Sequence, residues 1–157
     1  MAKNYSEELK TVVKNYLDMN DWHYTFDEEK GLFRCGVNLK GKLSECRLFI
    51  DIKDKVILNY AAIDMRADAE ARPRVAEFLT RANYGLTYGN FEMDWNDGEI
   101  RYKMTVDCEK QVPGYDVIDR MVVMPALMFQ RYGDGLLSVL FGFAEPKDAV
   151  EASEKRS

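Results

Sequence analysis

Apolar and charged residues alternate on both sides of the dipeptide Asp97-Gly98. Alternation with a period of two is typical of a β-strand with one buried face. Asp-Gly is a strong hairpin signal, because both residues of a two-residue turn take positive φ. With these residues as the turn, the large apolar side chains share one face and opposite charges meet on the other. The predicted pairs are Trp95–Ile100, Met93–Tyr102 and Phe91–Met104 on the apolar face, and Asp94–Arg101 and Glu92–Lys103 on the charged face.

The same period of two runs through residues 22–62, in four segments separated by turn residues. We interpret these segments as four antiparallel strands. A two-residue turn at Lys40-Gly41 would place Cys35 directly opposite Cys46 and Arg34 opposite Arg47. The side chains expected to face the core are Trp22, Tyr24 and Phe26, then Phe33, Cys35, Val37 and Leu39, then Cys46, Leu48, Ile50 and Ile52, and finally Val56, Leu58, Tyr60 and Ala62.

Three segments have the three- and four-residue apolar spacing of helices. The first covers residues 6–19 and has Ser6 as a plausible N-cap. The second begins near Pro73 and ends before Gly85, which suits the left-handed residue after a helix. The third begins near Asp116 and is apolar on nearly every side. Pro125 should kink it, and the glycines of residues 133–135 should break or bend it before it resumes over residues 136–143.

The order of elements is therefore a helix, four strands, a helix, two strands and a helix. This order predicts an α+β fold, in which helices pack on an antiparallel sheet. We expect residues 1–144 to form a single domain. Residues 145–157 are charged and show no periodicity, so we expect a disordered tail.

The formal net charge of −5 disfavours a nucleic-acid partner. The first ten residues lack the apolar segment of a secretory signal, and three cysteines without pair-like spacing suit a reducing compartment. The stretch Met121–Gln130 has no formal charge but is much shorter than the ~20 residues that span a bilayer. We therefore expect a cytoplasmic protein that binds neither nucleic acid nor membrane.

No residue pattern indicates catalysis, a metal or a cofactor. His23 is the only histidine and falls on the polar side of its strand. Opposed strand cysteines would strain a disulfide, so we expect Cys35, Cys46 and the outward-facing Cys108 to be free thiols. Residues 94–99 superficially match a calcium loop, but the ligand spacing fails and the terminal glutamate is missing. We predict a protein that is not an enzyme.

Two surfaces have more apolar or like-charged residues than a monomer usually exposes. On the outward side of the four-stranded segment, Leu32 should lie opposite Phe49, and Ile57 and Ile63 share that side. The third helix has too little polar surface to be covered by one sheet alone. We therefore predict that Leu32, Arg34, Arg47, Phe49 and Ile57 bind a protein partner, and that Met121, Met124, Met128 and Phe129 mediate self-association in a homodimer.

The stretch from Glu77 to Cys108 resembles the YbjN family, whose members are described as bacterial sensory transduction regulators. The segments that carry the resemblance are RANYG at 81–85, GNFE at 89–92 and DGEIRY at 97–102. The order of elements extends it over residues 6–143. The family is similar in fold to the class I chaperones of type III secretion, which are acidic homodimers that bind segments of other proteins. The resemblance implies that fold, but it supplies no catalytic motif and does not establish a function.

The combined hypothesis is a chaperone-like or regulatory module that binds segments of a partner protein, of unknown identity. The alternative is a small-ligand sensor or enzyme. Such a protein would need a pocket between the sheet and the helices, for which the candidate lining residues are Tyr60, Tyr84, Tyr102 and Cys35. Convergent polar groups with shifted pKa values would favour this alternative, and a filled core would oppose it.

Overall fold

The computed structural model describes residues 2–155 as an α+β fold with the predicted alternation of helices and strands, followed by one further helix. The elements, in chain order, are α1 (Glu7–Met19), β1 (Tyr24–Asp27), β2 (Leu32–Asn38), β3 (Glu45–Ile52), β4 (Val56–Arg66), α2 (Arg72–Asn83), β5 (Asn90–Met93), β6 (Glu99–Asp107), α3 (Tyr115–Leu140) and α4 (Pro146–Lys155).

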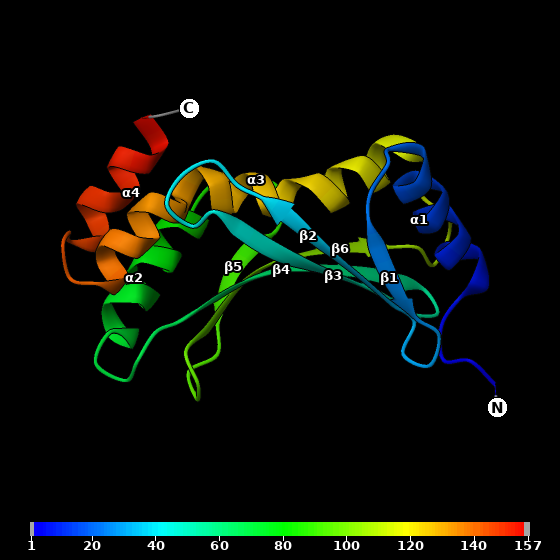
Figure 1. Ribbon diagram of the computed structural model, residues 1–157, viewed down its shortest axis with the longest axis horizontal. Coiled ribbons are helices and arrows are strands. Elements are labelled where there is room, and N and C mark those ends of the chain that lie inside the picture. Colours follow the sequence, from blue (N-terminus) through cyan, green and yellow to red (C-terminus); the bar gives the residue numbers. More distant parts are fainter. Residues whose placement is uncertain (1, 156–157) are drawn as a thin grey trace.

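The six strands form one antiparallel sheet in the order β1-β2-β3-β4-β6-β5. The helices lie on one side of this sheet, with α3 running along its length, α1 at the β1 end, and α2 and α4 at the β5 end (Figure 1). The other side curves inward and carries no helix. We call the helix-covered side the inner face and the uncovered side the outer face.

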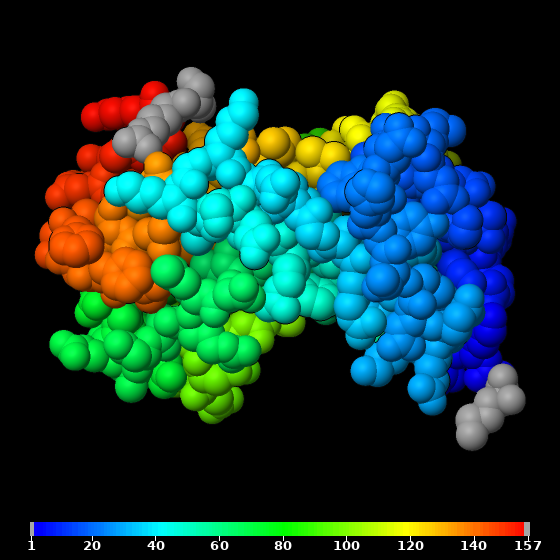
Figure 2. Space-filling view, in the orientation of Figure 1, coloured from blue at the N-terminus to red at the C-terminus, as the bar shows by residue number. Residues whose placement is uncertain are grey.

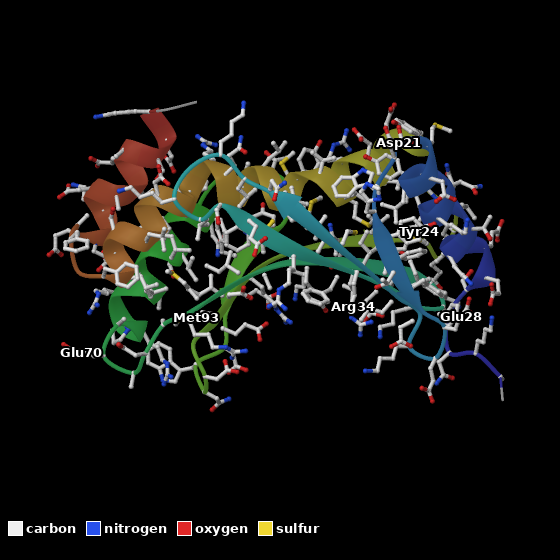
Figure 3. All side chains as sticks on the ribbon, viewed as in Figure 1. Asp21, Tyr24, Glu28, Arg34, Glu70 and Met93 are labelled. Carbon is white, nitrogen blue, oxygen red and sulfur yellow. The ribbon has the colours of Figure 1, made fainter. Side chains whose placement is uncertain are left out.

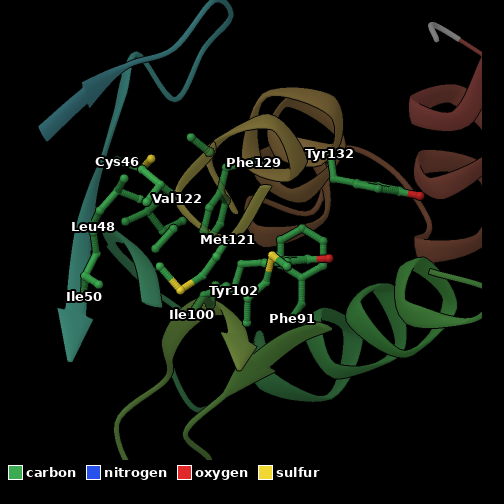
Figure 4. Close-up of a cluster of buried hydrophobic side chains, with 14 of the residues drawn as sticks. Cys46, Leu48, Ile50, Phe91, Ile100, Tyr102, Met121, Val122, Phe129 and Tyr132 are labelled. Carbon is green, nitrogen blue, oxygen red and sulfur yellow. The ribbon is translucent and has the colours of Figure 1, made fainter. Parts of the chain in front are cut away.

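The core lies between α3 and the inner face of the sheet. Strands β3, β5 and β6 supply buried apolar side chains that meet those of α3 (Figure 4). Phe91 makes edge-to-face contacts with Tyr102, Phe129 and Tyr132, at centroid distances of 4.8, 5.4 and 5.7 Å. Such aromatic pairs stabilise a core beyond the burial of their area. The other labelled members of this cluster are Cys46, Leu48, Ile50, Ile100, Met121 and Val122.

Helix α1 begins as the sequence predicts, because the Ser6 hydroxyl accepts a hydrogen bond from the backbone N–H of Leu9 at 3.2 Å. Its apolar side packs on the core through four buried residues, Leu9, Val13, Tyr16 and Leu17. The Tyr16 hydroxyl also donates to the Asp119 carboxylate at 2.5 Å, which links α1 to α3. Burial and the nearby carboxylate raise the pKa of Tyr16, so this hydroxyl keeps its proton.

The β5–β6 and β2–β3 hairpins form as predicted, but each of these two loops is longer than the sequence suggests. In the β5–β6 hairpin, Met93 pairs with Ile100 and Phe91 pairs with Tyr102, a shift of two residues from the predicted register. In the β2–β3 hairpin, Cys35 pairs with Leu48 instead of Cys46. A shift of two keeps every side chain on its predicted face. Trp95 moves into the loop, where it is exposed.

The predicted orientation of β4 is wrong. Ile57, Asn59 and Ala61 are fully buried on the inner face, whereas Leu58 and Tyr60 lie on the outer face. The buried Asn59 has a specific partner in α3. Its Nδ2 donates to the carbonyl oxygen of Met121 at 2.7 Å, and to that of Val122 at 3.4 Å.

Pro125 is the reason why the Met121 carbonyl needs an outside donor. In an α-helix, the carbonyl of residue i accepts from the N–H of residue i+4, and proline has no N–H. The Met121 carbonyl therefore has no helical donor, and Asn59 of β4 supplies one. The Asn59 Oδ1 atom is buried without a hydrogen-bond partner. The sheet thus satisfies a backbone group that the helix leaves open.

The predicted break at residues 133–135 does not occur, because α3 continues to Leu140. The two glycines instead allow close packing. A Cβ atom at Gly133 would lie 2.5 Å from Leu43 Cδ1, and one at Gly135 would lie 2.5 Å from Ser153 Oγ. A side chain at either position would force the Leu43 or Ser153 side chain to shift. The β2–β3 loop and α4 therefore sit directly against the backbone of α3.

The prediction of a disordered tail is wrong for residues 146–155, which form α4. This helix packs on α2 and α3 and buries a stripe of four mostly small residues, Pro146, Ala149, Val150 and Ser153. Their spacing is helical, but only Val150 is strongly hydrophobic, so the sequence signal is weak. Residues 156 and 157 lie outside the described part of the chain.

Candidate functional site

The outer face of the sheet presents two neighbouring rows of side chains that the strand register aligns. The first row is Thr25, Arg34, Phe49, Tyr60, Lys103 and Asn90. The second row is Gly36, Arg47, Ala62, Arg101 and Glu92. Figure 3 shows Arg34 on the side of the sheet away from α3. We call these two rows the central patch.

One arginine guanidinium group lies near each of two aromatic rings in the central patch. The guanidinium carbon of Arg101 lies 4.3 Å from the centroid of the Tyr60 ring, and that of Arg47 lies 5.7 Å from the Phe49 ring. Phe49 and Tyr60 face each other across β3 and β4. The patch carries four basic side chains against a single carboxylate, Glu92, although the chain as a whole has a net charge of −5. Within these two rows, basic side chains therefore outnumber acidic ones.

Acidic residues border the patch and pair with its cations. Arg34 lies 3.7 Å from Asp27, and Arg47 lies 2.8 Å from Asp64. Glu92 lies 3.4 Å from Arg101 and 3.3 Å from Lys103, so one carboxylate serves two cations. The basic side chains of these pairs are between 37% and 56% exposed. Solvent-exposed pairs contribute only about 0–1 kcal/mol each, so an incoming group can replace them.

A hollow of about 580 Å³ opens on the outer face over Gly36. Its side-chain walls include Arg34, Arg47, Phe49 and His23. A Cβ at Gly36 would have no atom within 4 Å, and glycine itself has no side chain, so the space above this residue is open. The space-filling view shows the lower edge of the molecule hollowed between its two ends (Figure 2). The uncovered face is thus concave and includes a defined recess.

The structure places four of the five predicted partner-binding residues on the outer face, and buries the fifth. Leu32, Arg34, Arg47 and Phe49 share this face. Ile57 is fully buried on the inner face, so its assignment to a binding surface is wrong. The predicted opposition of Arg34 and Arg47 is also wrong, because Arg34 pairs with Phe49 and Arg47 pairs with Gly36. The two arginines are diagonal neighbours.

Tyr60, Arg101 and Lys103 belong to this patch, although the sequence does not predict them there. The predicted orientation of β4, which is wrong, places Tyr60 in the core. The sequence pairs the two basic residues with acids of one hairpin, and nothing in it places β6 beside β4. Their alternation with buried residues was the available signal. It put both side chains on the solvent face of β6, but it could not show which strand lay next to them.

The predicted self-association residues separate into two groups. Met121 and Phe129 are buried in the core, at 0% and 1% exposure, so their assignment to a contact surface is wrong. Met124 and Met128 are partly buried and pack against the core from its edge. Leu127, which was not among the predicted residues, is 45% exposed. The helix has an apolar outward side, but that side is narrower than the sequence suggests.

The candidate lining residues of the alternative ligand pocket do not come together. Tyr60 lies on the outer face, and Tyr84 is 91% exposed at the end of α2. Tyr102 and Cys35 are buried in the filled core, and the Tyr102 hydroxyl donates to the carbonyl of Tyr88. These four residues therefore do not line a common pocket.

The three cysteines are free thiols, as predicted, and all are buried. Cys108 is thus not the outward-facing residue that its position in the alternation suggested. Burial raises the pKa of Cys35 to about 11 and that of Cys46 to about 12, and it also raises the pKa of Cys108. Thiols with such pKa values stay protonated at neutral pH and are poor nucleophiles.

Within residues 2–155, no group of three or more His, Cys, Asp or Glu side chains is placed to hold a metal ion. Nor is any helix in this described region both long enough and apolar enough to cross a membrane. The candidate site is the open sheet face with its central patch.

Comparison with known proteins identifies the family. The sequence profile of the YbjN family, described as "Putative bacterial sensory transduction regulator", matches residues 10–138. The chain belongs to the YbjN family. The description of the family is that of a regulator.

A solved structure that also carries the name YbjN has the same fold. The chain is similar to the crystal structure of "YbjN, a putative transcription regulator from E. coli", with a TM-score of 0.55 and 11% sequence identity. The match covers 80% of this chain and 91% of the other. At this identity the similarity shows a common fold. No curated protein matches the chain.

Proposed function

We propose that this protein is a non-enzymatic regulator that binds an extended segment of a partner protein across the outer face of its sheet. The observation that carries the proposal is the central patch. Two aromatic rings and four basic side chains are grouped there, on a concave face without a covering helix. Aromatic and arginine side chains are the residue types most enriched at binding hot spots.

The arrangement of the sheet supports a segment as the partner. Phe49 and Tyr60 lie side by side on central strands, so a chain that crosses the strands would meet both rings and the flanking cations. The patch is open along its length, which suits an extended peptide better than an enclosed small molecule. Regulation by binding another protein also agrees with the description of the family.

Site-specific photo-crosslinking in cell extract tests this function. A photoreactive phenylalanine analogue at Tyr60 should crosslink to a partner protein, and mass spectrometry should identify the attached peptide. The same analogue at Tyr84 is the matched control, because Tyr84 is exposed at the end of α2, away from the outer face. Crosslinking to the same protein with equal yield from both positions, or from neither, would contradict the proposal.

We also propose that the protein forms a homodimer through the outward side of α3. A hollow of about 330 Å³ lies there, with Val123, Met124 and Leu127 beside Asp116 and Arg120. A two-fold contact places the same surface of both copies together, so the acid of one copy can meet the arginine of the other. The apolar residues between them would leave water at the same time.

Light scattering coupled to size exclusion should give twice the chain mass of 18.2 kDa at micromolar concentration. Leu127→Glu should shift the protein to monomer, because it places a carboxylate within the apolar contact. Phe143→Glu is the matched control, since Phe143 is 84% exposed between α3 and α4 and should leave the mass unchanged. A monomeric wild type would show that the outward side of α3 does not mediate self-association.

A further inference from the structure

The two arginines nearest the hollow over Gly36 are unusually well placed to receive an anionic group. Arg34 and Arg47 come from adjacent strands, two register positions apart, and both contribute to the wall of the hollow. Their acidic partners, Asp27 and Asp64, belong to different strands, β1 and β4. Each arginine is therefore paired to one side only, and the space between them is open over Gly36.

Arginine binds carboxylates through two parallel hydrogen bonds, which makes the contact strong and directional. Both arginines line the hollow, so a carboxylate that enters it could replace their exposed pairs with Asp27 and Asp64, which lie 3.7 and 2.8 Å away. The floor of the hollow is open, because a Cβ at Gly36 would have no atom within 4 Å. Phe49 forms an apolar wall beside it, so the aliphatic part of a glutamate side chain could also be covered.

Acidic residues at the edges of the outer face restrict which anions fit. Asp51 lies beside the patch on β3, and Glu99 lies beside it on β6. These residues would repel a polyanion that extends beyond the central patch. A nucleic-acid strand carries a phosphate at every nucleotide, and it stacks its bases on free aromatic faces. Here the guanidinium group of Arg101 already lies over the Tyr60 ring. A peptide with a few acidic side chains fits this charge pattern better.

We propose that Arg34 and Arg47 hold an acidic side chain of the bound segment in the hollow over Gly36. The inference rests on the proposed function, and it specifies that the partner segment is acidic. The remaining cations, Arg101 and Lys103, lie further along the same two rows. They provide a second attraction for an acidic residue toward the β6 end of the patch.

Fluorescence anisotropy with a defined probe tests the proposal. The probe is a fluorescein-labelled decapeptide in which glutamate alternates with leucine, and its control replaces each glutamate with glutamine. The glutamate peptide should bind the wild type at least about tenfold more tightly than the glutamine peptide. The double variant Arg34→Gln/Arg47→Gln should remove most of this preference. Arg81→Gln, a change on α2 away from the outer face, should preserve it.

Gly36→Leu tests whether peptide binding depends on the hollow or only on general attraction between charges. Its side chain would enter open space at a residue without positive φ, so the fold should tolerate it. This variant keeps every charge of the patch. It should nevertheless weaken the binding of the glutamate peptide by about tenfold, because the leucine side chain fills the hollow. Circular dichroism confirms that each variant is folded. Unchanged binding by Gly36→Leu would overturn the assignment of the hollow.

A labelled twelve-nucleotide oligothymidylate tests the alternative that the patch binds single-stranded nucleic acid. It should bind weakly, without dependence on residue 36. Tight binding that Gly36→Leu abolishes would overturn the choice of an acidic peptide in favour of single-stranded nucleic acid. Failure of the proposed contact between the two arginines and an acidic side chain can be distinguished from failure of the proposed function. If the hollow variants have no effect but Tyr60 still crosslinks specifically to a partner, the outer face binds a segment of different chemistry.

Discussion

Asn59→Asp should destabilise the protein by roughly 3–5 kcal/mol at pH 7, the range for a buried charge without a partner. The substitution preserves shape but replaces the Nδ2 donor with an oxygen. That oxygen would face the Met121 carbonyl, which Asn59 reaches at 2.7 Å and which Pro125 leaves without a helical donor. Chemical denaturation monitored by circular dichroism measures the loss.

The loss should depend on pH in a defined direction. Burial would raise the pKa of the introduced carboxyl in the folded state, above the value of about 3.9 in the unfolded chain. The folded state then binds the proton more tightly, so the variant loses stability as pH rises through and above that unfolded value. At low pH the protonated carboxyl can donate to the Met121 carbonyl, and the difference from wild type should shrink.

Asn59→Leu is the matched control for this prediction. It removes the donor, which leaves the Met121 carbonyl unsatisfied at a cost of about 1–3 kcal/mol. It also removes Oδ1, which is buried without a partner and itself unfavourable. The loss should therefore be smaller than for Asn59→Asp and should show no pH dependence of its own. Equal, pH-independent losses for both variants would contradict the role assigned to the hydrogen bond.

Gly98→Ala should cost about 3 kcal/mol in the free energy of unfolding, far more than a surface substitution usually does. Gly98 has a φ of +76°, and a Cβ atom there would lie 1.9 Å from the backbone oxygen of Ala67. The Gly98 carbonyl also accepts from the Ala67 N–H at 2.9 Å. The methyl group would push the β4–α2 connection away from the β5–β6 loop and break this contact.

Gly85→Ala separates the cost of a positive φ from the cost of the contact with Ala67. Gly85 has a similar φ of +86°, but a Cβ at that position would have no atom within 4 Å. Its loss should reflect backbone conformation alone, about 1–2 kcal/mol. The excess measured for Gly98 then reports the contact with Ala67. If Gly85→Ala costs as much as Gly98→Ala, that contact contributes nothing.

Calcium provides a further check on the same loop. The Asp94 and Asp97 carboxylates each accept a backbone hydrogen bond within the loop, from Asn96 at 2.8 Å and from Glu99 at 2.9 Å. Their role is to fix the turn, so added calcium should leave the melting temperature of the wild type unchanged. A calcium-dependent rise would show that the loop binds the ion.

The faces of the β5–β6 hairpin could be predicted from sequence, but its register could not. A shift of two residues leaves each side chain on the same face, so the alternation fits both registers equally well. The longer loop is selected by contacts outside the alternating pattern. Two aspartates bond to the loop backbone, and Gly98 rests on Ala67. The β2–β3 hairpin was predicted with the same error for the same reason.

The outer face was only partly predictable because its composition depends on strand order. Arg34, Arg47 and Phe49 could be placed on one face from the alternation in β2 and β3 alone. The pairing of β4 with β6 then brings Tyr60 beside Lys103 and Ala62 beside Arg101. These strands are separated in sequence by α2 and β5. No local pattern can specify such a neighbour.

The sequence by itself determined the helices and strands up to β6, the start of α3 and the α+β class, because each depends on local periodicity and on turn or cap residues. Tertiary structure decided the orientation of β4. Apolar residues occupy both sides of that strand, and the polar Asn59 favours the wrong side if only local hydrophobicity is considered. Asn59 is buried because Pro125, far along the chain, leaves a carbonyl in α3 without a donor. The physical reason is that the need of a buried backbone group for a hydrogen bond outweighs the preference of one side chain for water.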